Sequence, residues 1–414
     1  MRNPKIRFKG YADTWEQRKL GDVCERVQGN DGRMDLPTLT ISVANGWMRQ
    51  EDRFSSNIAG KEQKNYTLLH KGELSYNHGN SKLAKYGTVF SLEIYEEALV
   101  PRVYHSFRMT KGVASFIEYY FATKIPDREL AKLISSGARM DGLLNIGFDE
   151  FMGINIKLPS VCEQEKISEY FRNLDHLITL HQRKCEEIKT LKKFMLQKMF
   201  PQNGENVPEI RFDGFTNAWE QRKLLSCIQS ITDFRGRTPK KLGMDWSESG
   251  YLALSALNVK DGYIDFSQDV HYGNQELYDK WMSGKELHRG QVLFTTEAPM
   301  GNVAQVPDNK GYILSQRTIA FDVEEEILSE NFLATLLRTP NVFNDLTALS
   351  SGGTAKGVSQ KSLSGLDVVI PKNIDEQNKL ADYFINLDNL ITLHQRKCDE
   401  LQSIKKFMLQ NMFV

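Results

Sequence analysis

The sequence is poor in cysteine and has no long apolar run. Its five cysteines are scattered without CxxC spacing, which argues against a disulfide framework or a zinc site and fits reduced thiols in a cytoplasmic protein. Because no stretch of about 18 apolar residues occurs, we expect no transmembrane helix. The N-terminal stretch, MRNPKIRFKGYADTW, holds no apolar segment of the kind that a signal peptide needs. These absences predict a soluble, cytoplasmic protein.

The common motifs of catalysis are also missing. The sequence has no Walker phosphate loop, GxGxxG fingerprint, HExxH or GxSxG. It lacks the Asn-Pro-Pro-aromatic tetrapeptide with which an adenine-N6 methyltransferase holds a flipped base. Residues 236–241, GRTPKK, come closest to a phosphate loop, but they lack the second Gly and have Pro where a helix should begin. We therefore expect no catalytic residue and no metal site in this chain.

Neither sign of charge is in excess. Lys and Arg number 53, and Asp and Glu also number 53, so the formal net charge is zero. An isolated DNA-binding module is usually basic. Any contact of this chain with nucleic acid must therefore depend on local basic patches or on a partner.

A long repeated stretch stands out among what is present. Residues 163–200, EQEKISEYFRNLDHLITLHQRKCEEIKTLKKFMLQKMF, return with few changes as residues 376–413. Neither copy contains Pro or Gly, and apolar residues alternate at spacings of four and three, which predicts an amphipathic helix roughly 55 Å long. We expect the two helices to pack antiparallel as a coiled coil. The predicted seam residues are Ile167, Phe171, Leu174, Ile178, His181, Cys185, Leu380, Phe384, Leu387, Ile391, His394 and Cys398.

Some seam and motif residues could be read as functional. His181 and His394 occupy matching seam positions, where a polar residue more often fixes register than binds a metal. Cys185 and Cys398 are interpreted as small apolar packers. The tryptophans of a second repeated motif are interpreted as core anchors rather than recognition elements.

That second motif opens each half of the chain. Residues 4–20, PKIRFKGYADTWEQRKL, return as residues 208–224, PEIRFDGFTNAWEQRKL. A chain of 414 residues is too long for one ordinary domain, and the repeats indicate an internal duplication with pseudo-two-fold symmetry. The predicted class is α+β, with two mixed, sheet-rich domains separated by two long antiparallel helices. The predicted segments are domain 1 at 1–158, a central helix at 159–203, domain 2 at 204–371 and a C-terminal helix at 372–414.

Each half should contain short strands and one or two short helices. The patterns predict helices at 113–123 and 329–338 and a final strand at 154–158 or 366–370. Each final strand then leads into a long helix. Asp375 is the expected N-cap of the second long helix, while Ser160 or Cys162 would cap the first.

The linker at 201–208, PQNGENVP, breaks the first long helix. It joins the end of that helix to the opening motif of the second half. If the long helices are antiparallel, the C-terminal end should lie near the first opening motif, just as residue 200 lies near residue 208.

These motifs, in this order, resemble a type I restriction-modification specificity subunit (the HsdS family). The resemblance rests on IRFxGF/Y with WEQRKL, on LPS or IPK running into EQxKI/L, and on LITLHQRKC and KKFMLQ, and it spans the whole chain. It implies two target-recognition domains, each reading one half of an asymmetric, interrupted DNA sequence. The antiparallel helices would set the gap between the halves. This chain would be a non-catalytic subunit of the complex.

The resemblance also implies partners. Two modification subunits would carry S-adenosylmethionine and methylate adenine in double-stranded DNA. Two restriction subunits would add ATP- and Mg²⁺-dependent translocation and cleavage. This chain itself would bind no cofactor and no membrane.

The richest DNA-contacting loop of the second half is predicted at 233–241. Its sequence, DFRGRTPKK, crowds cations onto a Gly/Pro turn and resembles a loop found in many recognition domains of the family. Other candidates follow strands or lie in a Gly-rich loop, where forked donors could reach bases or phosphates. The predicted contacts of this half are Arg235, Arg237, Thr238, Lys240, Lys241, Asn258, Lys260, Gln316, Arg317, Thr354 and Lys356.

The first half lacks that loop. Its equivalent at 28–34, QGNDGRM, has one cation, so the candidates shift to residues 76–85, YNHGNSKLAK, and to later loops. Different loops imply two half-sites of different sequence. The predicted contacts of this half are Asn77, His78, Asn80, Ser81, Lys82, Lys85, Arg102, Tyr104 and Arg139.

The long helices carry more apolar residues than one seam needs. Such a surplus indicates a partner site or packing on the helix's own domain, and we favour docking of the modification subunits. Two other interpretations stay open: a protein scaffold with two globular binding units on a coiled coil, and a stand-alone DNA enzyme. The surplus residues are Tyr170, Leu177, Leu180, Phe194, Leu196, Tyr383, Leu390, Leu393, Phe407 and Leu409.

Overall fold

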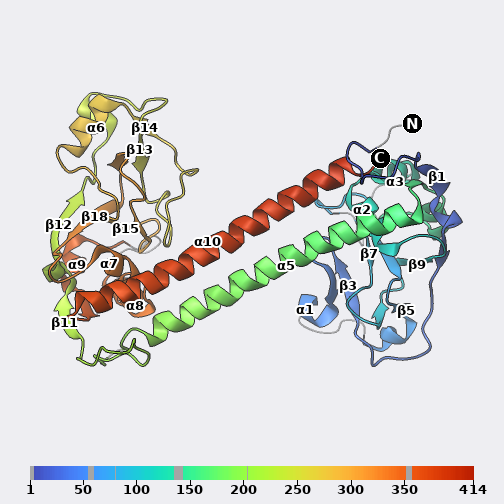
Figure 1. The fold of residues 1–414 in the computed structure, drawn as a ribbon, viewed down its shortest axis with the longest axis horizontal. Helices are drawn as coiled ribbons and strands as arrows, with labels where there is room; N and C mark the ends of the chain where they lie inside the picture. Colours follow the sequence, from blue (N-terminus) through green and yellow to red (C-terminus); the bar gives the residue numbers. More distant parts are fainter. Residues whose placement is uncertain (1–3, 55–59, 80, 135–142, 203, 351–356) are drawn as a thin grey trace. The chain divides into compact units, whose positions relative to one another are not determined.

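The computed structural model describes residues 4–54, 60–79, 81–134, 143–202, 204–350 and 357–414. The chain divides into two compact units. The first unit comprises residues 1–181 and 396–414, and the second unit comprises residues 182–395. Each unit holds a sheet-rich domain with part of helix α5 (Val161–Lys198) and part of helix α10 (Ile374–Asn411), drawn in green and red in Figure 1.

The first unit is built on a four-stranded antiparallel sheet in the order β2-β9-β6-β7. Around it lie three strand pairs, β1–β10, β3–β4 and β5–β8, all antiparallel. The strands are β1 (Glu16–Lys19), β2 (Cys24–Arg26), β3 (Leu39–Ser42), β4 (Gly46–Arg49), β5 (Thr67–His70), β6 (Leu74–Asn77), β7 (Thr88–Ser91), β8 (Glu97–Val100), β9 (His105–Met109) and β10 (Asn155–Leu158). The short helices are α1 (Gln50–Phe54), α2 (Ala114–Ala122), α3 (Asp127–Leu133) and α4 (Phe148–Met152).

The second unit has a four-stranded sheet in the order β12-β18-β15-β16 and a three-stranded sheet in the order β14-β13-β17. The β13–β17 pair is parallel, so the unit is mixed, as predicted. Its strands are β11 (Glu220–Lys223), β12 (Ile228–Asp233), β13 (Tyr251–Leu254), β14 (Tyr272–Gly273), β15 (Val292–Thr295), β16 (Val303–Gln305), β17 (Tyr312–Leu314), β18 (Thr318–Val323) and β19 (Asp367–Ile370). Its short helices are α6 (Gln275–Met282), α7 (Glu330–Leu336), α8 (Pro340–Leu349) and α9 (Gln360–Gly365).

The duplication is visible in matched contacts of the two units. Strand β1 pairs with β10 as β11 pairs with β19. The amide of Ile6 donates to the Asn411 carbonyl at 3.0 Å, and the amide of Ile210 donates to the Lys198 carbonyl at 2.9 Å. Each opening motif thus lies against the C-terminal end of a long helix, which confirms the proximity expected from the repeats.

The repeated tryptophans are core anchors, as predicted. Trp15 and Trp219 are each 3% exposed. The Trp15 ring lies 6.1 Å from the Phe413 ring, and the Trp219 ring lies 5.8 Å from the Phe200 ring. Burying one large aromatic side chain contributes about 2 kcal/mol, so the ends of the long helices belong to the cores of the domains.

Within each unit the long helices run antiparallel. In the first unit, Phe171 contacts Phe413, while Asp175, further along α5, pairs with Lys405, which precedes Phe413 in the chain. Most of the predicted seam residues are buried, while His181, Ile391 and His394 are half-buried. Both long helices begin within two residues of the sequence-based expectation because a Pro ends the strand before each.

The N-cap of α10 differs from the prediction. The Asn373 Oδ1 atom accepts from the amides of Asp375 at 2.7 Å and Glu376 at 3.3 Å. Asn373 therefore caps the helix, and Asp375 lies in its first turn, where its charge favours the helix dipole. At α5 the cap is Ser160, whose Oγ accepts from the Glu163 amide at 3.4 Å.

Candidate nucleic-acid interface

Loops of the second unit converge on a hollow of about 600 Å³. It lies where β12, β13 and β17 end, beside helix α6. The indole of Trp281 on α6 is fixed there by a 2.9 Å hydrogen bond from Nε1 to the Leu314 carbonyl. The lining residues, which include five predicted contacts, are Arg237, Thr238, Pro239, Lys240, Asp245, Trp246, Ser255, Ala256, Leu257, Asp269, His271, Trp281, Ala298, Ser315, Gln316 and Arg317.

The predicted loop at 233–241 is joined to the second predicted set by a direct contact. Gln316 donates from Nε2 to the Arg237 carbonyl at 3.3 Å. The Arg237 guanidinium lies 4.3 Å from the Phe234 ring centre and donates to the Trp281 carbonyl. Arg237 is thereby held at the wall of the hollow, and part of its guanidinium is already engaged in a hydrogen bond within the protein.

The other cations of this loop are more accessible to a ligand than Arg237 is. Arg235, Lys240 and Lys241 are exposed. Thr238 caps the short helical turn Pro239–Leu242, where its side chain accepts from the Lys241 amide. An exposed cluster of cations on a capped turn can contact phosphates without ordering the loop first.

Three residues of the hollow have left-handed backbone. The φ angles are +44° at Asp269, +51° at Ala298 and +63° at Arg317. Such conformations are unfavourable for residues other than Gly, and they tend to gather at ligand-contacting sites. The surrounding fold therefore sustains local strain where the loops converge.

The chemistry of the hollow suits base edges. Arg317 and Gln316 are exposed forked donors, and Arg317 also pairs with Glu297 at 3.2 Å. The carboxylate of Asp269 accepts from Ser255 Oγ at 2.6 Å. Donors and acceptors side by side can distinguish base pairs in the major groove, whereas phosphate oxygens offer only acceptors.

Asn258 has a structural role in the second unit. It is fully buried, its Oδ1 accepts from the Ser255 amide at 2.9 Å, and its Nδ2 donates to the carbonyls of Asp265 and Gln268. Its polar atoms are committed within the loop, so we withdraw it from the predicted DNA contacts. Lys260, two residues on, is half-buried.

In the first unit, strand pairing brings two predicted sets together. Strands β6 and β9 pair, with Tyr76 opposite His105, so the loop after β6 and the turn before β9 meet at one sheet end. Ser81, Lys82, Lys85 and Arg102 are exposed there. Asn77 ends β6, and its Oδ1 accepts from the Gly79 amide at 3.1 Å.

Two other predicted contacts of the first unit point inward. His78 is 6% exposed, with Nδ1 2.7 Å from the Leu144 carbonyl and Nε2 2.8 Å from the Val103 carbonyl. Tyr104 is 8% exposed, with its hydroxyl 3.0 Å from Thr40 Oγ1. Both are assigned a role in holding loops together rather than in touching DNA.

Four predicted contacts lie outside the described residues. They are Asn80, Arg139, Thr354 and Lys356.

The sequence prediction missed part of the hollow. Asp245, Trp246, Asp269 and His271 line it, and His271 stacks on Trp246 with ring centres 5.4 Å apart. No spacing rule marks them, although a polar residue beside a Trp in a Gly-rich stretch is a weak signal. Among the residues that the structure describes, no cluster of three or more His, Cys, Asp or Glu could hold a metal ion, and no helix is long and apolar enough to cross a bilayer.

The surplus apolar residues of the long helices fall into two groups. Tyr170 and Tyr383 pack on Phe8 and Phe212 of their own opening motifs, and Leu196 and Leu409 pack on their own domain cores. The others remain about 40 to 55% exposed. These, with two neighbours of the same kind, are Leu177, Leu180, Ile404 and Phe407 in the first unit and Leu191, Phe194, Leu390 and Leu393 in the second.

Comparisons with known proteins bear on these features. The sequence model of the family described as "Type I restriction modification DNA specificity domain" matches residues 12–190 and 218–403. The type I restriction enzyme MjaVIII specificity subunit of Methanocaldococcus jannaschii is 23% identical over 66% of this chain, and the match spans 64% of that relative, just under two thirds. The putative MjaX specificity subunit of the same organism is 20% identical over 97% of this chain and 93% of its own length.

Solved structures share the fold. A type I restriction-modification S subunit from M. genitalium superposes with a TM-score of 0.63 at 11% identity, over 100% of this chain and 99% of that one. A chain from a study of complex assembly and conformational transition in a type I R-M system gives a TM-score of 0.50 at 14% identity, over 97% and 98% of the two chains. With both halves matched by the family model, the chain belongs to the type I restriction modification DNA specificity domain family and carries that domain twice.

Proposed function

We propose that this chain is the non-catalytic specificity subunit of a type I restriction-modification complex, in which each unit reads one half of a bipartite DNA site. The observation that carries the proposal is the hollow of the second unit, where separate loops bring Lys240, Gln316 and Arg317 together. The first unit offers a different loop set at one end of its sheet, with Lys82, Lys85 and Arg102 exposed. Two unlike reading surfaces on a duplicated frame fit two unlike half-sites.

The proposal places catalysis and cofactors on partner subunits. Two modification subunits would supply S-adenosylmethionine and methylate adenine, and two restriction subunits would supply the ATP- and Mg²⁺-dependent steps. The complex would act in the cytoplasm, which is compatible with the five free cysteines. The antiparallel helices would set the gap between the half-sites.

The exposed apolar groups on the helices support two docking places for modification subunits. The group in the first unit contains Leu180 and Phe407, and the repeat-related group in the second contains Leu393 and Phe194. A residue at 40% exposure or more is rarely part of the core that stabilises its own fold. Because the two groups are related by the internal repeat, they would offer equivalent sites to two copies of one partner.

The salt dependence of DNA binding tests the proposal. In the assembled methyltransferase, the triple substitution Arg235→Ala, Lys240→Ala and Lys241→Ala should weaken binding to all sequences and reduce the slope of log K against log salt by about one per lost phosphate contact. Lys397→Ala on α10, where Lys397 pairs with Glu400, is the control and should leave the slope unchanged. Binding by the wild-type complex that does not depend on salt would favour a protein scaffold instead.

Base readout needs a separate variant. Arg317→Ala should relax the preference at one position of one half-site, at a loss of about 1 to 3 kcal/mol in discrimination. The measurement is methylation of a site library in which each base is varied. An unchanged base preference would remove Arg317 from the reading surface.

A further inference from the structure

The two long helices are joined by an ion pair that occurs twice. In the second unit, Lys192 Nζ lies 2.6 Å from Asp388 Oδ1. In the first unit, the repeat-related Lys405 pairs with Asp175 Oδ1. In both units the lysine takes the Oδ1 atom of the aspartate and leaves Oδ2 for another donor.

The two domains supply different donors to that second oxygen. Arg338, just after α7, donates from Nη1 to Asp388 Oδ2 at 2.7 Å. Tyr119 on α2 donates its hydroxyl to Asp175 Oδ2 at 2.9 Å. One repeated acceptor is therefore met by a cation in the second unit and by a neutral hydroxyl in the first.

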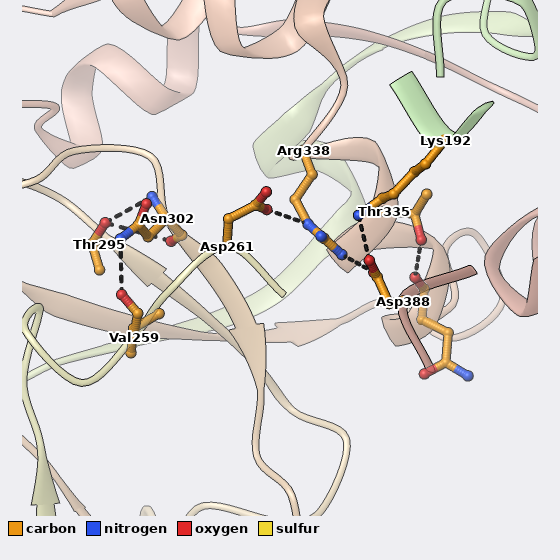
Figure 2. Close-up of polar contacts among 9 residues, drawn as sticks. Lys192, Val259, Asp261, Thr295, Asn302, Thr335, Arg338 and Asp388 are labelled. Atoms are coloured by element: carbon orange, nitrogen blue, oxygen red, sulfur yellow. Dashed lines mark hydrogen bonds and ion pairs between the residues drawn. The ribbon is translucent and has the colours of Figure 1, made fainter. Parts of the chain in front are cut away.

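Arg338 also contacts a carboxylate on its other side. Figure 2 shows its Nε directed at Asp261, while Nη1 and Lys192 share Asp388. The side chains of Arg338 and Lys192 are only 12% and 13% exposed, whereas Asp261 is 70% exposed. Burial opposes the charged form of Arg338, yet the two carboxylates raise its pKa, so it stays a cation in this position.

The turn that carries Asp261 fits closely around the guanidinium. Gly262 has a φ of +88°, and a Cβ there would come within 2.6 Å of Arg338 Nη2. No larger residue could occupy this position without displacing Arg338. The close approach of this turn to Arg338 therefore depends on a glycine at position 262.

The same turn leads directly out of the hollow. Ser255, Ala256 and Leu257 line the hollow, and Val259 accepts at its carbonyl from Asn302 Nδ2 at 2.9 Å. The Asn302 amide in turn donates to Thr295 Oγ1 at 2.9 Å. Figure 2 shows the turn held on one side by this sheet contact and on the other by Arg338.

We propose that Arg338 is a positioning residue that ties the DNA-reading hollow of the second unit to the helix pair through Asp261 and Asp388. The inference rests on the proposed function. The guanidinium contacts both the turn leaving the hollow, through Asp261, and helix α10, through Asp388. Tyr119 in the first unit contacts the helix pair through Asp175, the Phe171 ring and Lys405, and serves as the matched comparison.

The test uses Asp261→Asn and Arg338→Lys in the complex with its modification subunits. Asp261 is largely exposed, so Asp261→Asn should barely change thermal stability. Arg338→Lys keeps the charge but loses the fork that reaches both carboxylates. Both variants should lower the preference for the correct gap over gaps changed by one base pair by about threefold or more, while base preference within the half-sites stays the same.

Three results would overturn the inference. These are an unchanged gap preference in both variants, an equal loss of methylation at every gap, or an altered base preference. Asp261→Glu should restore the gap preference, and Tyr119→Phe should leave it unchanged. If the wild-type complex methylates no bipartite site, the proposed function itself fails, and that result is separate from these variant outcomes.

Discussion

Buried ion pairs at the opening motifs join each domain to a long helix. Arg7 lies 2.7 Å from Glu163, which is 1% exposed, and Arg211 lies 2.7 Å from Glu376, which is 2% exposed. The Trp219 indole also donates to Glu376 Oε1 at 3.1 Å, whereas Trp15 Nε1 has no hydrogen-bond partner among the described residues. The buried glutamate thus accepts one more hydrogen bond in the second unit than its counterpart in the first.

Removing either arginine should strongly destabilise its unit. Arg211→Met leaves the Glu376 carboxylate buried without its cation, which costs about 3 kcal/mol. Arg7→Met should cost at least as much, because no indole remains to share the charge of Glu163. Thermal unfolding measures both, and Arg18→Met, which breaks an exposed pair with Glu16, should cost less than about 1 kcal/mol. Equal effects of all three substitutions would refute this explanation.

Glu118 should make the stability of the first unit depend on pH. Burial raises the pKa of its carboxyl above the usual value, although Ser91 donates to it from its amide and its hydroxyl. Because the folded state holds this proton more tightly, the contribution to stability is full below the unfolded pKa and is lost as pH rises through the folded pKa. Glu118→Gln should therefore raise the melting temperature at neutral pH and have little effect near pH 4.

Glu129, a carboxyl whose pKa is shifted in the opposite direction, is the control. Lys132 and Asn155 lower the pKa of Glu129 by hydrogen bonding. Its contribution is present above the unfolded pKa and lost as pH falls, so Glu129→Gln should lower the melting temperature at neutral pH. If the two substitutions shift the melting temperature in the same direction, the assigned cause is wrong.

Individual contact residues were the hardest feature to predict from sequence. Loops rich in Asn, His and Tyr can direct their polar atoms either to DNA or to other groups of the protein itself. Asn258, His78 and Tyr104 take the second option. Composition locates such loops, but the direction of each side chain depends on tertiary contacts that no local pattern encodes.

At the scale of elements, the long helices could be predicted almost completely. Their spacing identified the seam because a buried stripe must repeat with the helix period. It could not separate the surplus apolar residues covered by the opening motifs, such as Tyr170, from those left exposed, such as Phe194. That distinction depends on how each domain packs on its helix.

The exposed groups lead to a stoichiometric prediction. Phe194→Glu should remove one docking place, and Phe407→Glu should remove the other, because a charge cannot be buried in an apolar contact without a partner. Native mass spectrometry should find one modification subunit bound by either single variant and none bound by the double variant. Both residues are about half exposed, so the isolated variants should keep their melting temperature. Two bound subunits in the double variant would exclude this surface.

The helix pair should act as a ruler for the gap. One heptad inserted at equivalent points of α5 and α10 preserves the seam and lengthens the pair by about 10 Å, or roughly three base pairs. The methylated site should keep both half-sites and gain that gap. The same gap with altered half-sites would contradict this role, while insertion into α5 alone should disrupt the seam.

At the scale of the whole molecule, duplication with divergence is the main organising feature. The matched contacts of Ile6 with Asn411 and of Ile210 with Lys198 show one frame used twice. The sequence predicted this frame because its repeats are nearly identical. It could not predict the hollow, because residues as distant as Arg237, Asp269 and Arg317 meet there only through the sheet order.

The methylated motif of cells that carry this chain with its modification subunits tests the central claim most directly. Long-read sequencing of their genomic DNA should reveal one bipartite motif, with two unlike half-sites at a fixed gap and methylated adenine in each. Cells that lack only this chain should show no such motif. A continuous or palindromic motif, or methylation that persists without this chain, would contradict the account.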